Sequence, residues 1–156
     1  MSNPEEKLQS LSIQLPPAPK PVGVYKPIIV VGNMAYLSGH GPLHTDGHLT
    51  IGRVGETLDQ EGGSKAARQT GLALLATLRN HLGSLNRVQR VVKLLGMVQC
   101  TPEFTSQPAV INGCSELFQE VFGADRGVGA RSAIGVNALP GGMAVEIEGI
   151  FEIEPR

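Results

Sequence analysis

Few residues of this 156-residue chain carry charge, and the shortage limits the partners that it can bind. Charged residues make up 17% of the sequence and aromatic residues 4%, tryptophan is absent, and the formal net charge is −1. A nucleic-acid groove needs a positive field and aromatic stacking platforms, so this composition argues against nucleic-acid binding. Because so few charges keep the surface hydrated, we expect part of it to be covered by another copy of the chain.

Long apolar runs are also missing from the sequence. No stretch approaches the roughly 18 residues that a membrane span requires, and the N-terminus lacks the basic and apolar regions of a secretory signal. The only two cysteines, Cys100 and Cys114, have no metal-binding spacing and are expected to be buried, inert thiols. The sequence therefore predicts a cytoplasmic protein that binds no membrane.

A short helix and an arm are expected before the main domain. An asparagine, a proline and two glutamates are typical of a helix start, which predicts a helix over residues 2–10. The prolines between Leu15 and Pro21 favour an extended arm laid over the domain. We therefore divide the chain into an N-terminal helix and proline-rich arm, residues 1–21, and a domain, residues 22–156.

The periodicity of the domain predicts five strands and two helices. The strands are expected at 24–31, 34–38, 88–98, 130–139 and 143–154, and the helices at 64–82 and 106–122. Two helices packed on one face of a mixed sheet make an α+β architecture. The other face of the sheet is then uncovered, and Ile150 shares it with a row of glutamates. We expect that face to pack against neighbouring subunits.

Motifs for phosphate, dinucleotide, zinc-protease or serine-hydrolase chemistry are absent from the sequence. His40, His44 and His48 recur at every fourth residue, a spacing that would align metal ligands on a helix. Glycine and proline residues between them forbid a helix, so we expect solvent-exposed loop histidines. Neither a metal nor a cofactor is predicted.

The most specific pattern lies in the last two predicted strands. Residues 130–140 read A-R-S-A-I-G-V-N-A-L-P, and residues 145–150 read V-E-I-E-G-I. This pair of segments is similar to the signature of the RidA family, the reactive intermediate deaminases, which are also called YjgF or endoribonuclease L-PSP proteins. The resemblance covers about residues 22–153. Its further matches, in order and spacing, are Tyr25, Leu37-Ser38-Gly39, the first long helix, and Asn112 before Leu117-Phe118.

The resemblance implies a chorismate-mutase-like fold and homotrimers with clefts between subunits. It implies hydrolysis of small 2-imino or 2-enamino acids to 2-oxo acids and ammonia, without a cofactor. Arg131 would hold the substrate carboxylate, because a planar guanidinium can donate two charge-assisted hydrogen bonds to it. Glu146 would orient or deprotonate the attacking water. The other implied substrate-binding positions are Tyr25, Ser38, Gly39, Asn112 and Ala133.

The sequence departs from the best-known branch of the family at Ala133, where that branch has a cysteine. The change keeps the backbone contact, an oxyanion-type donor, but enlarges the pocket. The loop 41–63 and the N-terminal arm also look longer than in compact members. These differences leave the identity of the substrate open.

Other interpretations stand beside the deaminase, a hydrolase acting on C=N bonds. Arg131 could be a structural ion-pair residue, and Glu146 could be one more solvated glutamate. The alternative function is a non-catalytic trimeric binding protein for small carboxylates such as 2-oxo acids. A ribonuclease is disfavoured, because the sequence has no basic stripe.

The expected turn at Pro140-Gly-Gly142 makes a hairpin of the last two strands, which gives a geometric test. Arg131 and Glu146 share a sheet face only in a register such as Gly135 opposite Glu146. They would then bracket a small ligand at roughly 13 Å along the strand. In the other register they lie on opposite faces, and the two residues cannot act together on one ligand.

Overall fold

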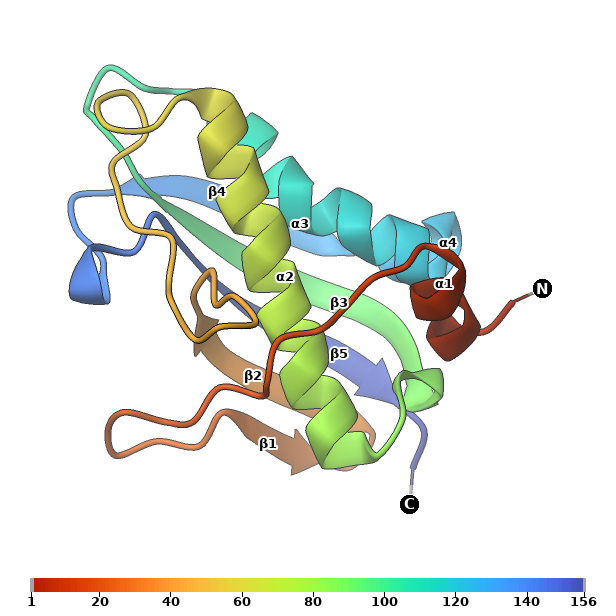
Figure 1. Ribbon diagram of the computed structural model, residues 1–156. Coiled ribbons are helices and arrows are strands. Elements are labelled where there is room, and N and C mark those ends of the chain that lie inside the picture. Colours follow the sequence, from red (N-terminus) through yellow and green to blue (C-terminus); the bar gives the residue numbers. More distant parts are fainter. Residues whose placement is uncertain (1, 156) are drawn as a thin grey trace.

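The computed structural model describes residues 2–155 as a sheet with helices packed on one face (Figure 1). The elements are α1 (Pro4–Ser10), β1 (Ile28–Val31), β2 (Met34–His40), α2 (Gln60–Leu82), η1 (Leu85–Arg87), β3 (Val88–Gln99), α3 (Gln107–Phe122), α4 (Ala124–Gly127), β4 (Ala130–Val136), η2 (Pro140–Gly142) and β5 (Val145–Ile153). The predicted α+β class, a mixed sheet with two helices on one face, is confirmed. In this part of the chain no helix is both long and apolar enough to cross a bilayer.

The order of the strands differs from the expected one. The sheet runs β1-β2-β5-β3-β4, with β3 and β4 parallel and the other pairs antiparallel. The predicted hairpin of the last two strands is therefore wrong, because β3 lies between them. Met97 on β3 pairs with Glu146 on one side and with Ile134 on the other. A strand–helix–strand crossover through α3 makes β3 and β4 parallel neighbours, and the Pro140–Gly142 turn then returns the chain across β3.

The two long helices that cover the sheet pack closely against each other, because α3 presents a glycine at the contact. A Cβ atom on Gly113 of α3 would lie 2.0 Å from the backbone oxygen of Ser64 in α2. Helix α2 begins at Gln60, earlier than predicted, because the side chain of Asp59 accepts a hydrogen bond from the Gly62 amide and caps its first turn. It ends as expected at Gly83, whose left-handed backbone (φ 85°) closes the helix.

The two sides of strand β5 show which face of the sheet is buried and which is open. Its buried residues alternate with more exposed ones, as the sequence predicts. The residues that face the helices are Val145, Ile147, Phe151 and Ile153, and those on the open face are Glu146, Glu148, Ile150 and Glu152. The open face also presents apolar side chains from other strands: Ile29, Val31, Tyr36 and Ile134 are between 44% and 62% exposed. The helices leave this face uncovered within one chain.

The N-terminal segment is fastened to the helical layer before it reaches the sheet. Asn3 and Glu6 form a reciprocal capping box at the start of α1. The Glu5 carboxylate contacts the Arg79 guanidinium at 2.6 Å and accepts a hydrogen bond from the Leu85 amide at 2.8 Å. Leu8 and Pro16 are buried. The chain then crosses α2 and reaches the edge of the sheet at β1 (Figure 1).

The two cysteines are buried and free, as predicted. Burial raises the pKa of the Cys114 thiol far above its ordinary value, so this thiol stays protonated. Neither cysteine has the accessible surroundings that make a thiol reactive, since both are buried.

Candidate functional site

The histidines do not form the exposed loop group that the sequence suggested. His40 is only 4% exposed, because β2 continues through it and carries its ring under α2. Its Nδ1 donates to the Ser38 carbonyl at 2.6 Å, and its Nε2 accepts from the Thr77 hydroxyl at 2.7 Å. Burial lowers the pKa of His40, so the ring is neutral and structural. The expectation of an exposed His40 is wrong.

The other two histidines do lie in the loop after β2. The rings of His44 and His48 stack with their centroids 4.1 Å apart, and His48 is exposed. Within residues 2–155, no three side chains of His, Cys, Asp or Glu come together in a way that could hold a metal ion.

One cavity gathers four of the seven residues that the resemblance assigns to the site. It has a volume of about 600 Å³ and is lined by Tyr25, Ser38, Gly39 and Glu146. The remaining lining residues come from the arm (Pro19, Lys20, Pro21 and Val22), from Pro27, His40 and Gly41, from the following loop (Leu43 and Leu49), and from the turn before β5 (Pro140, Gly141 and Met143).

A β-bulge positions Glu146 over strand β2. Leu37 pairs with Gly149 and His40 with Ile147, so two residues of β2 stand opposite a single residue of β5. The side chain of Glu146 lies against Gly39 so closely that a Cβ atom there would be 2.5 Å from Oε1. The absence of a side chain at position 39 therefore gives the carboxyl group its place in the cavity.

Hydrogen bonds tie the Tyr25 loop to the same end of β2. The Ser38 hydroxyl donates to the Lys26 carbonyl at 2.6 Å, and the Ser38 amide donates to the Pro27 carbonyl at 3.0 Å. The Tyr25 hydroxyl accepts a hydrogen bond from the Val22 amide at 3.3 Å. The tyrosine and the arm are thereby joined at the edge of the cavity.

The Glu146 carboxyl binds its proton more tightly than an ordinary glutamate does. Burial is the larger cause of its raised pKa, and the nearby carboxylate of Glu148 adds to the effect. A carboxyl group of this kind can both accept and return a proton closer to neutral pH. Its burial and its raised pKa distinguish Glu146 from the exposed Glu148 on the same strand.

Arg131 does not meet Glu146 within one chain. It pairs with Leu94, whose side chain is buried beneath the helices, whereas Glu146 projects from the open face. The guanidinium donates to the Ser115 hydroxyl at 3.0 Å and to the Pro108 carbonyl at 3.2 Å, both in α3. The geometric test set by the sequence therefore ends with the two residues on opposite faces of one chain's sheet, and no register of a hairpin applies, because β3 separates β4 from β5.

The structure also does not show Arg131 in an ion pair. Its partners in α3 are neutral, and among the described residues no carboxylate forms a salt bridge with it. Helix α3 thus holds the guanidinium by two hydrogen bonds, and Arg131 places a positive charge at the edge strand β4.

Asn112 and Ala133 belong to the Arg131 side of the molecule. Asn112 is exposed on α3, between the two residues of this helix that Arg131 contacts. Ala133 is partly buried on the edge strand β4 and packs against the core. The sequence-predicted residues therefore form two groups: four around the cavity, and three at the edge of the sheet near α3.

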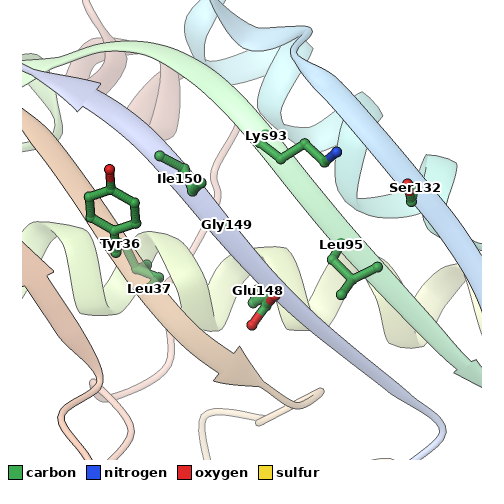
Figure 2. Close-up of a pocket in the computed structure, with 8 residues that line it drawn as sticks. All are labelled: Tyr36, Leu37, Lys93, Leu95, Ser132, Glu148, Gly149 and Ile150. Carbon is green, nitrogen blue, oxygen red and sulfur yellow. The ribbon is translucent and has the colours of Figure 1, made fainter.

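The open face carries a further hollow of about 350 Å³. Figure 2 shows its side chains standing on four neighbouring strands, with Lys93 and Leu95 on β3 between Ser132 on β4 and Ile150 on β5. This hollow occupies the middle of the uncovered sheet face and is separate from the Glu146 cavity.

Sequence reasoning missed the residues that close the Glu146 cavity. Lys20 and its neighbours in the arm, together with Leu43, Leu49 and Met143, were not assigned to any site. The prolines of the arm predict an extended segment, but no local pattern in the sequence predicts which part of the domain such a segment contacts.

A family model described as "YjgF/chorismate_mutase-like, putative endoribonuclease" matches residues 5–140 of the chain. Two curated relatives match nearly the whole sequence. The chain is 40% identical to Protein TCP17 of Trypanosoma cruzi over 146 residues, covering 94% of this chain and 91% of that protein. It is 31% identical to the 2-iminobutanoate/2-iminopropanoate deaminase of Dermatophagoides farinae over 142 residues, covering 91% and 95%.

Solved structures share the fold. Protein Atu1372 from Agrobacterium tumefaciens, a protein of unknown function, is 37% identical and superimposes with a TM-score of 0.87, covering 96% of this chain and 91% of that one. RidA from the Antarctic bacterium Psychrobacter sp. PAMC 21119 is 32% identical with a TM-score of 0.62, covering 90% of this chain and 98% of that one.

Proposed function

Because the chain belongs to the YjgF/chorismate mutase-like family, which includes RidA, we propose that it hydrolyses small 2-imino and 2-enamino acids to 2-oxo acids and ammonia. Its fold is the chorismate-mutase-like fold of that family. The observation that carries the proposal is the cavity that unites Tyr25, Ser38, Gly39 and Glu146. Support comes from a relative, 31% identical, that is named for imino-acid deamination.

The proposed site lies in clefts between the subunits of a homotrimer. Arg131 and Glu146 lie on opposite faces of the sheet of one chain, so they can act on one small ligand only if they come from two copies. The uncovered apolar face of the sheet supports such an assembly, because an exposed patch of this kind is typical of a contact surface. Each copy would then contribute Glu146 to one cleft and Arg131 to another.

The reaction needs a bound acid, an oriented water and a group that carries a proton. Arg131 of one copy holds the substrate carboxylate by two charge-assisted hydrogen bonds. Glu146 of the neighbouring copy takes a proton from water as its oxygen attacks the carbon of the C=N bond. Glu146 returns that proton to nitrogen, which gives a neutral carbinolamine. The carboxylate then carries the hydroxyl proton to the amine nitrogen as the C–N bond breaks and the C=O bond forms, so that ammonia leaves with a 2-oxo acid. A 2-enamino acid first tautomerises to the imine.

Imines already hydrolyse in water, so binding, orientation and one well-placed carboxyl group suffice for catalysis. The amide at Ala133 is the proposed oxyanion-type donor for the charge that develops in the cleft. This chemistry requires no cofactor from the protein.

A coupled assay tests the proposal. 2-Iminopropionate is generated in place, and ammonia release above the buffer rate is compared for the parent, Arg131→Ala and Glu146→Gln. We expect each variant to lose about 100-fold of the catalysed rate, the range of a general acid–base group or of two charged hydrogen bonds. Arg68→Ala removes an arginine that pairs with Glu120 on the surface and serves as the control. Equal ammonia release from parent and Arg131→Ala would refute the proposal.

The same experiment separates the alternative, a trimeric protein that binds 2-oxo acids or other small carboxylates without turnover. Saturable binding of pyruvate that depends on Arg131, with no release of ammonia above the buffer rate, would favour it. A ribonuclease would instead bind RNA with a steep dependence on salt, which a net charge of −1 disfavours.

A further inference from the structure

We propose that Gln99 is a positioning residue for Glu146: its buried side chain joins the loop after β2 to the turn before β5 and so keeps these two segments in place around the carboxyl group. This inference rests on the proposed function, in which Glu146 carries the proton, and adds a residue that acts through others. It is carried by the hydrogen bonds that converge on the last residue of β3.

The side-chain amide of Gln99 is buried and hydrogen-bonded at both of its ends. Only 6% of the residue is exposed. Its Oε1 accepts a hydrogen bond from the Leu139 amide at 2.8 Å. Its Nε2 donates to the Gly52 carbonyl at 2.9 Å and to the Gly142 carbonyl at 3.3 Å, so the partners fix which end of the amide is the oxygen. One side chain thus joins the loop to the turn.

Backbone hydrogen bonds join the same segments around Gln99. The Gln99 amide donates to the Ala144 carbonyl at 2.9 Å, directly before β5 begins. The Gly52 amide donates to the Gly142 carbonyl at 3.0 Å, and the Ala144 amide donates to the Thr50 carbonyl at 3.1 Å. The end of β3, the loop and the entry to β5 therefore form one hydrogen-bonded junction, and the Gln99 side chain lies at its centre.

The two segments that Gln99 joins border the cavity that contains Glu146. The lining residues that they contribute are Leu49, Pro140, Gly141 and Met143. The loop and the turn also meet there, because a Cβ atom on Gly41 would be 2.5 Å from Sδ of Met143 and 3.3 Å from Cδ2 of Leu49. Glu146 itself follows the turn by four residues. A shift of the junction would therefore move both the carboxyl group and the side chains that cover it.

The protonation of Glu146 reports on that cover, because burial is the larger cause of its raised pKa. The titratable groups around it are Glu148 on its own strand and Lys20, Tyr25 and His40 in the lining of the cavity, while β3 presents the uncharged Met97. Among them Glu148 raises the pKa of Glu146, and it does so less than burial does. If the loop and the turn separate, water reaches the carboxyl group, and its raised pKa should fall.

Rate measurements on Gln99→Met test the proposal. Methionine keeps the length of the side chain and loses all three hydrogen bonds of the amide. With 2-iminopropionate generated in place, we expect kcat to be about 10-fold below the parent value, because misplacement of a catalytic group is costly. KM should stay within about twofold, because Arg131 still holds the carboxylate. The midpoint of the pH dependence of kcat should move to lower pH, because Glu146 has lost part of its cover.

Thr70→Val is the matched control. Thr70 is also buried, and its hydroxyl donates to the Ala66 carbonyl at 2.8 Å within α2, outside the lining of the cavity. This variant should keep the parent kcat and pH midpoint. A parent-like kcat in Gln99→Met would overturn the proposal, as would a lower kcat with an unmoved midpoint or an equal loss in Thr70→Val. If Gln99→Met does not fold, Gln99→Asn is compared in the same way, because its shorter amide cannot reach both segments.

Titration of the Glu146 carboxyl group decides the question without turnover. Carbon-13 NMR of protein labelled at the glutamate carboxyl groups follows it, and Glu146→Gln identifies its signal by removing it. We expect Glu146 to titrate at a lower pH in Gln99→Met than in the parent, and at the parent pH in Thr70→Val. A lower midpoint would support the positioning role even if no imine were hydrolysed and the deaminase function had failed. Equal midpoints in the parent and Gln99→Met would overturn the role of Gln99 even if the deaminase were active.

Discussion

Glu146 and Gly39 are fitted to each other across the bulge between β5 and β2. The carboxyl group of the one fills the space that a side chain on the other would need, with Oε1 only 2.5 Å from the position of a Cβ atom. Gly39 thus contributes to the site without any chemistry of its own. The finding explains why a glycine follows Ser38 at the end of β2, where the backbone itself does not require one.

Substitution of Gly39 by alanine should abolish most of the activity and leave the fold intact. The added methyl group displaces a flexible side chain, not backbone, so we expect a small change in the free energy of unfolding. Misplacement of a catalytic group by about 1 Å can cost on the order of 100-fold in rate. Gly23→Ala is the control, because a Cβ atom there meets nothing closer than 3.6 Å. Parent-like ammonia release from Gly39→Ala would contradict the fit.

Mixed assemblies of two inactive variants should recover activity. Arg131→Ala and Glu146→Gln are unfolded and refolded together, so that subunits assort at random. If each cleft takes one residue from each of two copies, about a quarter of the clefts regain both residues. Either variant refolded alone should remain inactive. A mixture that stays inactive, although its subunits have exchanged, would mean that the two residues do not share a cleft.

Stability should respond to pH through Glu146. Its pKa is raised in the folded protein, so the folded state binds the proton more tightly than the unfolded state does. The contribution of Glu146 to stability is therefore fully present below pH 4.5, its ordinary value, and is lost as the pH rises through the raised pKa. Glu146→Gln should consequently gain stability relative to the parent between pH 4 and pH 7. Urea unfolding at the two pH values measures the difference, and a gain in the opposite direction would contradict it.

A charge on the open face of the sheet should prevent assembly. Ile150 lies beside Tyr36 and Lys93 in the middle of that face (Figure 2). Ile150→Asp would place a carboxylate in the proposed subunit interface, where its desolvation is costly. We expect sedimentation to give a trimer for the parent and a monomer for Ile150→Asp. Val128→Asp alters an exposed apolar residue outside the sheet and should stay trimeric. A monomeric parent would refute the expected homotrimer.

Much of the fold could be predicted because the relevant signals are local. The alternation along β5 depends only on the two faces of one strand. The cap at Gly83 depends on one backbone conformation. The pairing of β4 with β3 was missed because the Pro140–Gly142 turn is a strong local hairpin signal. A helix between two strands favours a parallel crossover, and α3 lies between β3 and β4 in the sequence. The prediction gave this rule less weight than the hairpin signal of the turn.

The candidate site could be predicted only in part, for a similar reason. Ser38, Gly39 and Glu146 follow from the resemblance and do meet in one cavity. The part of the lining that comes from the arm does not follow from any local pattern, since the arm is located by contacts such as Glu5 with Arg79, far apart in the sequence. His40 shows the opposite error: glycine and proline after it suggested a loop, whereas β2 extends through it and buries its ring.

The fastening of the N-terminal helix has a practical consequence for handling the protein. The amide of Asn3 is already engaged with the Glu6 carboxylate, and the chain that follows leads without a break to Pro19 and Val22 at the cavity. A purification tag fused ahead of α1 would pull on the helix and on the arm that follows it. Strand β5 ends at Ile153, at the opposite end from Glu146 and the cavity, so an affinity handle is better attached after this strand.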